Sequence, residues 1–173
     1  MKNTLLLFFT LKSTIAFCQN QNLVSENFFP LFDFQINDTL KFSNENFLGK
    51  TTFINYWFKG CRPCIAEIPA LNKMNTLLKN NPNFQFISFS IDSTTVISKC
   101  VENFKITFPV FHLDKKQVEN LSLRSAPTNL IIDKNGVIKF VFTGGATDPN
   151  KAYEKIMKEI YPKILSTLSS GKN

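Results

Sequence analysis

The stretch that decides the fold is "NYWFKGCRPCIAEIP", residues 55–69, in which Cys61 and Cys64 stand three positions apart. An apolar, aromatic run leads up to Cys61, and apolar residues at helical spacing follow Cys64. The pattern predicts a buried strand that ends just before the pair and a helix that begins at it. Such a pair can be a working dithiol, half of a metal site or a structural cross-link.

The position of the pair favours a working dithiol. Unpaired N–H groups and the helix dipole stabilise an anion at a helix N-terminus, so Cys61 is expected to ionise more readily than an ordinary thiol. Cys64 follows one turn later, where Cα atoms are about 5 Å apart, within disulfide reach. Cys61 can then attack a partner's disulfide, and Cys64 can resolve the mixed disulfide. Arg62 adds positive charge beside the site, and Pro63 suits a first helical turn.

Other uses of the pair fit the sequence less well. A structural zinc site needs four ligands, and outside the motif the sequence offers only Cys18, Cys100 and His112, none with a partner at ligand spacing. A cross-link that closes so short a loop stabilises little. We therefore expect no metal and no cofactor, while a binding module with an idle cysteine pair stays open. Cys100 is expected to pack in the core, and His112 to lie at a strand edge.

Composition indicates one globular domain. The 173 residues are 43% hydrophobic and include 19 phenylalanines, enough for one core. Four cysteines are too few to build the fold from disulfides. The net charge is +7, but the basic residues are scattered, with no Arg/Lys cluster interleaved with aromatics. We therefore expect no nucleic-acid partner.

The N-terminus has the form of a signal peptide. Lys2 precedes a short apolar stretch, and small residues stand at the expected cleavage site after Cys18. We expect residues 1–18 to be a signal peptide, residues 19–173 to form the domain, and the protein to be exported to the periplasm, where cysteine pairs can oxidise. Membrane anchoring through this segment, or through a lipid on Cys18, is the alternative.

Hydrophobic periodicity predicts an α/β domain with a mixed sheet. The expected strands are residues 32–36, 39–42, 51–58, 84–91, 109–113, 129–133 and 137–142. The expected helices are residues 65–78, 97–104, 117–123 and 150–168. Pro69 is expected to kink the first helix, and Pro162 to bend the last or end its first part.

With these elements in place, the sequence resembles the TlpA/ResA-like branch of the thioredoxin family. The likeness rests on features in the expected order: residues 53–58, the motif "CRPC", Glu67, and "SAPTNLIIDKNGVI" at residues 125–138. It implies a thioredoxin fold, a central mixed β-sheet flanked by helices, with an N-terminal β-hairpin. It also implies an inserted helix and strand, which residues 93–113 would supply.

The resemblance assigns roles to single residues. Cys61 would attack and Cys64 would resolve. Pro127 would be a cis-proline beside the dithiol, which leaves the backbone of Ala126 free to pair with substrate. Glu67 would line the cleft and handle the proton of the Cys64 thiol, although spacing alone would make it a solvated helix residue.

Two positions depart from the family pattern. Asn55 stands where thioredoxins carry a buried aspartate, and Gly60 stands where a tryptophan usually precedes the first cysteine. Trp57, three positions before Gly60, is the remaining ring expected to shape the site. Loss of the tryptophan ring at position 60 is expected to widen the cleft.

The expected function is that of an exported thiol-disulfide oxidoreductase. The resemblance implies a reductant of disulfides in exported proteins, apocytochrome c among them, which a membrane-linked electron donor reloads. The redox potentials of known oxidoreductases span a range equivalent to about 7 kcal/mol, whereas one charge such as Arg62 stabilises a nearby thiolate by on the order of 1 kcal/mol. The motif therefore does not fix the redox potential. An exported oxidase or isomerase therefore stays open as the alternative.

Overall fold

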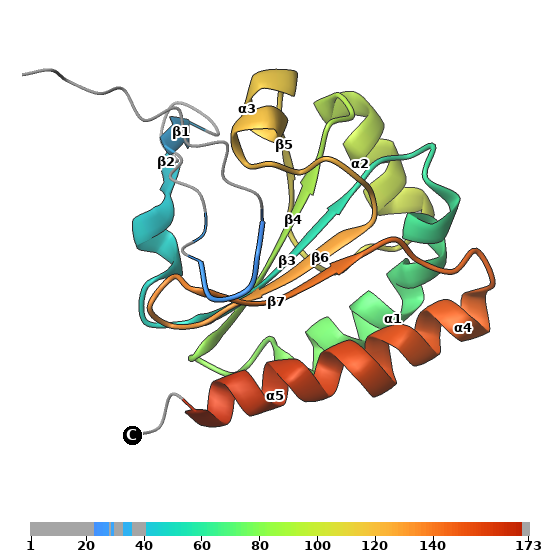
Figure 1. The fold of residues 1–173 in the computed structure, drawn as a ribbon. Helices are drawn as coiled ribbons and strands as arrows, with labels where there is room; N and C mark the ends of the chain where they lie inside the picture. The colour runs from blue at the N-terminus through green and yellow to red at the C-terminus, as the bar shows by residue number, and fades with distance from the viewer. Residues whose placement is uncertain (1–22, 28, 30–32, 36–40, 171–173) are drawn as a thin grey trace, which may run out of the picture.

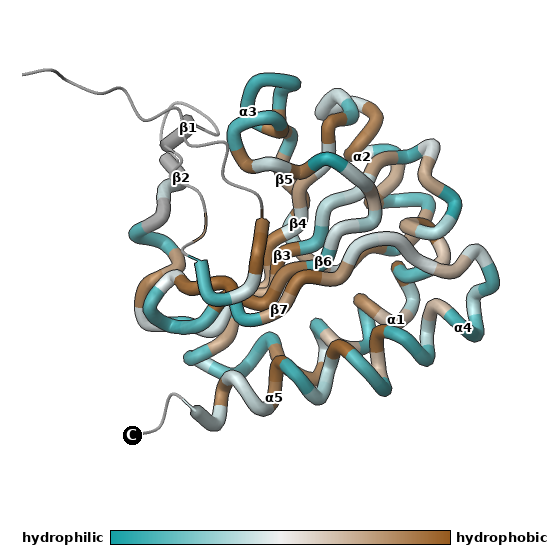
Figure 2. The backbone as a smooth tube through the Cα atoms, viewed as in Figure 1, coloured by the Kyte–Doolittle hydropathy of each residue, from teal (hydrophilic) through white to brown (hydrophobic). Residues whose placement is uncertain are grey.

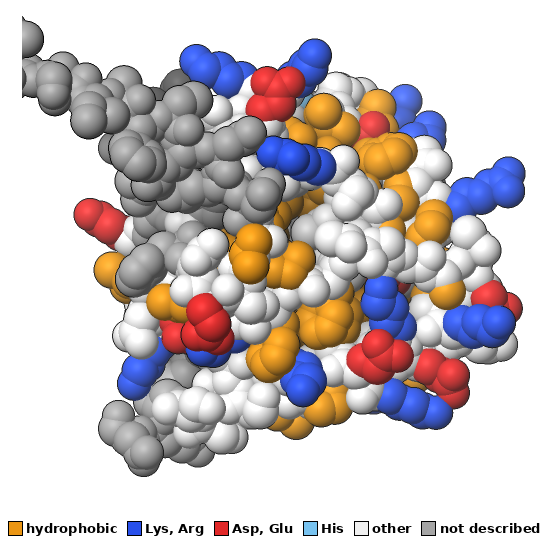
Figure 3. All heavy atoms as spheres, viewed as in Figure 1, with side chains coloured by type: hydrophobic (Ala, Val, Ile, Leu, Met, Phe, Trp, Pro, Cys, Tyr) orange, Lys and Arg blue, Asp and Glu red, His pale blue; other side chains and the backbone are white. Residues whose placement is uncertain are grey.

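A computed structural model describes residues 23–27, 29, 33–35 and 41–170. The predicted signal peptide, residues 1–18 with Cys18, lies outside the described residues, as do residues 37–38 between the first two predicted strands. Among the helices described, none combines the length and the apolar character that crossing a membrane requires. Lys and Arg side chains are spread over the face drawn in Figure 3, with Asp and Glu among them.

The centre of the fold is a five-stranded mixed sheet with strand order β5-β4-β3-β6-β7. Its strands are β3 (Thr51–Trp57), β4 (Phe84–Ser90), β5 (Val110–His112), β6 (Thr128–Ile132) and β7 (Ile138–Thr143). The first three run parallel, whereas β6 is antiparallel to β3 and β7 is antiparallel to β6. The sheet confirms the predicted α/β class with a mixed sheet.

The two predicted additions to the central sheet are present. Strands β1 (Asp33–Gln35) and β2 (Lys41–Ser43) pair antiparallel as a separate two-stranded sheet, followed by the short 3-10 helix η1 (Asn44–Phe47). Helix α2 (Thr94–Asn103) and strand β5 form the inserted helix and strand before α3 (Lys115–Asn120).

Helices cover both faces of the sheet (Figure 1). The face below the sheet in this view carries α1 (Arg62–Leu78) and the C-terminal run of α4 (Pro149–Glu154), η2 (Lys155–Ile160) and α5 (Tyr161–Ser170). Alternate residues of β3 point to opposite faces: Phe53 packs in the core cluster with α1, and Ile54 in the cluster on the other face. The apolar strands accordingly lie inside the molecule in Figure 2.

The two prolines that were predicted to disturb helices, Pro69 and Pro162, have different surroundings. Helix α1 continues through Pro69 as one helix. The last helix changes just before Pro162, because η2 is a π-helical turn in which the Tyr161 N–H donates to the Ile156 carbonyl, five residues back. Proline cannot donate the hydrogen bond of a regular helix, and the widened turn is followed by a new helix at Tyr161. The helix type therefore changes near Pro162, within a run that stays helical from Pro149 to Ser170.

Candidate active site

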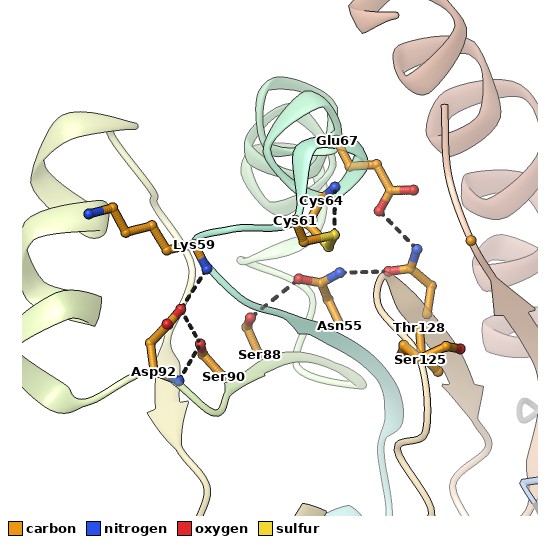
Figure 4. The surroundings of a disulfide bond; sticks show 12 residues. Asn55, Lys59, Cys61, Cys64, Glu67, Ser88, Ser90, Asp92, Ser125 and Thr128 are labelled. Carbon is orange, nitrogen blue, oxygen red and sulfur yellow. Dashed lines mark hydrogen bonds between the residues drawn. A yellow bond between two sulfur atoms is a disulfide. The ribbon is translucent and has the colours of Figure 1, made fainter. Parts of the chain in front are cut away.

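The cysteine pair lies where β3 gives way to α1 (Figure 4). Cys61 is the N-cap of α1, and its Sγ accepts a hydrogen bond of 3.3 Å from the Cys64 N–H. The two Cα atoms are 5.2 Å apart, and the cysteines form a disulfide. Arg62, the first residue of the helix, is exposed, and Pro63 follows it. The predicted geometry of the pair is confirmed, and the structure holds its oxidised form.

The pair is less exposed than we expected for an attacking thiol. Cys61 is 6% exposed and Cys64 is 2% exposed. Both belong to the core cluster on the α1 face, together with the buried ring of Trp57 and with Ala126 packed against the cluster. In the oxidised protein, little of either cysteine is therefore open to a partner, and Cys61 is the more exposed of the two.

Glu67 is buried, which overturns the spacing-based interpretation of a solvated residue. It is 0% exposed, its Oε2 accepts a hydrogen bond of 3.1 Å from Asn129 Nδ2, and its Oε1 has no hydrogen-bond partner among the described residues. Burial raises the pKa of the carboxyl to about 7, against the opposing effects of the Asn129 hydrogen bond and the Lys155 charge. Near neutral pH the carboxyl can therefore either hold or accept a proton.

Glu67 ends a buried polar chain that crosses the sheet below the disulfide. Asn129 Oδ1 accepts a hydrogen bond of 2.9 Å from Asn55 Nδ2, and Asn55 Oδ1 accepts one of 3.3 Å from Ser88 Oγ. Trp57 Nε1 donates to Ser88 Oγ at 2.9 Å. Asn55 is the cross-strand partner of both Ser88 and Asn129. The neighbouring strands β4, β3 and β6 therefore each place one polar side chain in the same row across the sheet.

Sequence reasoning missed Ser88 and Asn129. Ser88 stands between Ile87 and Phe89, and Asn129 directly precedes the apolar residues 130–132; a polar residue next to apolar ones in a predicted buried strand is the signal that could have identified them. Trp57 is buried, and its ring N–H donates to Ser88 Oγ within the polar chain. Asn55, which stands where thioredoxins carry an aspartate, occupies the middle of the chain.

The loop before β6 also reaches the site. The Ala126–Pro127 peptide bond is cis, the geometry that the resemblance implied, and Pro127 is buried while Ala126 is partly exposed. The Pro127 carbonyl accepts a hydrogen bond of 2.9 Å from the Gly144 N–H. At Gly145, next in the chain, the surfaces of Glu67, Pro63 and Pro127 converge. The structure thus brings the predicted proline and glutamate together beside the cysteine helix.

On the opposite side of the pair, Asp92 holds the turn that leads into Cys61. Its Oδ2 accepts hydrogen bonds from the Lys59 N–H at 2.6 Å and from Ser90 Oγ at 3.2 Å. His112 lies exposed at the end of the edge strand β5, with Nδ1 2.8 Å from the Asp92 carbonyl oxygen, which fits its predicted edge position.

Cys100 packs in the core, as predicted. It is buried on α2 and lies outside the disulfide. Burial, and secondarily the negative charge of Asp92, raise the pKa of its thiol, whereas Lys59 lowers it. A thiol in such surroundings is a poor nucleophile, which separates Cys100 from the pair at the helix terminus.

Comparison with known proteins agrees with this geometry. The sequence profile of the Redoxin family matches residues 24–157. The chain is 29% identical over 119 residues to the thiol-disulfide oxidoreductase ResA of Geobacillus kaustophilus strain HTA426, a match that covers 68% of this chain and 67% of that protein. It is 28% identical over 110 residues to the thioredoxin-like protein YneN of Bacillus subtilis strain 168, covering 62% and 64%.

Solved structures show the same fold. The solution structure of a thiol:disulfide interchange protein from Bacteroides sp. superposes with a TM-score of 0.66 at 21% identity, covering 87% of this chain and 94% of that one. Together with the profile match, this confirms the predicted thioredoxin fold. The chain therefore belongs to the Redoxin family, and its Cys61–Cys64 pair places it among the thiol-disulfide oxidoreductases.

Proposed function

We propose that the protein is an exported reductase of disulfides in other exported proteins. The observation that carries the proposal is the arrangement on α1: Cys61 caps the helix, Cys64 is paired with it, and the buried acid Glu67 lies one turn further on. The pKa of Glu67, raised to about 7, suits exchange of a proton with a thiol near neutral pH.

The proposed cycle moves two electrons from the protein to the substrate. The Cys61 thiolate attacks one sulfur of the substrate disulfide, whose S–S bond breaks as the mixed disulfide forms, and the other substrate sulfur leaves as a thiolate. Cys64 then gives its proton to the Glu67 carboxylate and attacks the Cys61 sulfur. The mixed disulfide breaks, the Cys61–Cys64 disulfide forms, and the second substrate sulfur leaves. Protons from Glu67 and water complete the substrate dithiol.

Neighbouring residues support the two sulfurs in this proposal. The Cys64 N–H, which donates to Cys61 Sγ, stabilises the attacking thiolate, and the exposed Arg62 adds a favourable charge. Beside Pro127, the partly exposed Ala126 offers its backbone to an extended substrate segment.

The proposed partners follow from the cycle. Each turnover ends in the disulfide, so a donor of two electrons must reduce the pair before the next one, and for an exported protein we propose a membrane-linked donor. The relatives named ResA and the form of residues 1–18 support a periplasmic location. Disulfide-containing exported proteins, with apocytochrome c as one candidate, are the proposed substrates.

Insulin reduction by dithiothreitol tests this function. The mature chain, residues 19–173, should accelerate the reaction, and neither Cys61→Ala nor Cys64→Ala should do so at the wild-type rate. A wild type no faster than the two variants would instead make the protein a binding module. Measuring the redox potential of the pair decides the direction, because a value near the roughly −120 mV of a strong oxidant would assign an oxidase.

A further inference from the structure

Gly144 and Gly145 follow β7, and each position requires glycine for a different reason. Gly144 has φ +69°, a left-handed conformation, and a Cβ built on it would find no described atom within 4 Å. Gly145 lies outside the left-handed region, so its backbone would accept an ordinary residue. A Cβ on Gly145 would, however, lie 2.8 Å from Glu67 Oε1, 3.0 Å from Pro127 Cγ and 3.2 Å from Pro63 Cβ. Position 144 needs glycine for conformation, and position 145 needs it for space.

The space at Gly145 is next to the unpartnered oxygen of the acid. Glu67 Oε1 is buried without a hydrogen-bond partner among the described residues, whereas Gly145 itself is exposed. The rings of Pro63 and Pro127 bound the same space. Lys155 Nζ donates to the Gly144 carbonyl, which ties the two glycines to η2. One exposed backbone segment therefore lies between solvent and the Glu67 carboxyl.

We propose that Gly145 is a positioning residue that keeps Glu67 Oε1 out of water. A methyl group at position 145 would meet Glu67 Oε1 first and the two rigid proline rings next, and Asn129 holds the carboxyl in place through its other oxygen. The exposed Gly144–Gly145 segment would instead move outward, and water would reach the carboxyl. The lack of a side chain at position 145 thus contributes to the pH at which Glu67 exchanges its proton. The consequence for the Cys64 thiol rests on the proposed function, whereas the titration of Glu67 does not.

The groups around Glu67 allow its titration to be isolated. Cys61 and Cys64 stand at the start of the same helix, Asn129 donates to the carboxyl from β6, and Lys155 acts on it from η2. In the oxidised protein the disulfide cysteines do not titrate, and the Asn129 amide has no acidic proton. Lys155 supplies a positive charge to the carboxyl. In the oxidised wild type, Glu67 is therefore the carboxyl among these groups whose titration is followed.

The proposal can be tested by an NMR titration of the oxidised mature protein labelled with ¹³C at the glutamate carboxyls. Glu67→Gln identifies the Glu67 signal by its loss. In Gly145→Ala, the pKa of Glu67 should fall from about 7 toward the 4.5 of a solvated glutamate. Gly144→Ala, the matched control, strains the backbone without adding a contact and should leave the pKa near 7. An unchanged pKa in Gly145→Ala, or an equal fall in Gly144→Ala, would overturn the proposal.

A double-mutant cycle covers the case in which Gly145→Ala folds poorly. Glu67→Ala removes the atom nearest to the added Cβ, so the loss of stability caused by Gly145→Ala should shrink in the Glu67→Ala background. Equal losses in both backgrounds would contradict the proposal. Neither experiment uses a substrate, so their outcome is independent of whether the protein reduces insulin.

Discussion

Two carboxylates lie on opposite sides of the disulfide, and they differ in what surrounds them (Figure 4). Asp92, partly exposed after β4, accepts hydrogen bonds from the Lys59 N–H and from Ser90 Oγ. Glu67, buried within α1, accepts one hydrogen bond from a neutral amide and leaves one oxygen without a partner among the described residues. These surroundings fit different roles: Asp92 holds the chain in place, whereas Glu67, with its raised pKa, suits the proton exchange that we propose.

The largest expected effect is on catalysis. Glu67→Gln keeps the size of the side chain but removes its exchangeable proton, so insulin reduction at pH 7 should slow by roughly 100- to 1,000-fold. Asp92→Asn, the matched change on the other side of the pair, should retain a rate within about fivefold of wild type. Initial rates at equal enzyme concentration measure both. If both variants lose the same fraction of the wild-type rate, the two carboxylates do not differ in their contribution to catalysis.

The next effect is on stability as a function of pH. The pKa of Glu67 is about 7 in the fold against 4.5 in an unfolded chain, so the folded protein loses stability as pH rises from 4.5 to 7. Glu67→Gln lacks this cost. The difference in free energy of unfolding between this variant and the wild type should increase in favour of the variant by on the order of 3 kcal/mol as pH rises across that interval. Above pH 7 the difference should stay constant. Urea unfolding of the oxidised proteins measures the gain, and parallel pH curves would contradict it.

A smaller effect concerns the structural carboxylate. Asp92→Ala leaves the Lys59 N–H and the Ser90 hydroxyl without their acceptor and should lower the free energy of unfolding by about 2 kcal/mol. Asp92→Asn keeps an acceptor oxygen and should lose less than half as much. Urea unfolding at pH 7 compares the three proteins. If both variants match the wild type, the turn before Cys61 is held by other contacts.

The contrast also shows what the sequence could and could not predict. Apolar runs and the Cys61–Cys64 spacing were sufficient for the mixed sheet and for the dithiol at the helix terminus, because both depend on local pattern. The burial of Glu67 depends on what packs over α1, and helical spacing alone suggested a solvated residue. Ser88 and Asn129 became partners of Asn55 through cross-strand register, which links residues far apart in the sequence.

The smallest expected effect is at Ser88, which lies in the buried polar chain between Asn55 and Trp57, away from Glu67. Ser88→Ala removes the acceptor of the Trp57 N–H and a donor to Asn55, so it should lower the free energy of unfolding by about 1 kcal/mol. Asn55 and Asn129 separate Ser88 from the carboxyl, and the pKa of Glu67 should stay near 7. Urea unfolding and the ¹³C titration of one sample measure both quantities. A clear change in that pKa would mean that the chain transmits its state across three strands, and Glu67 would then depend on the whole network rather than on its immediate contacts.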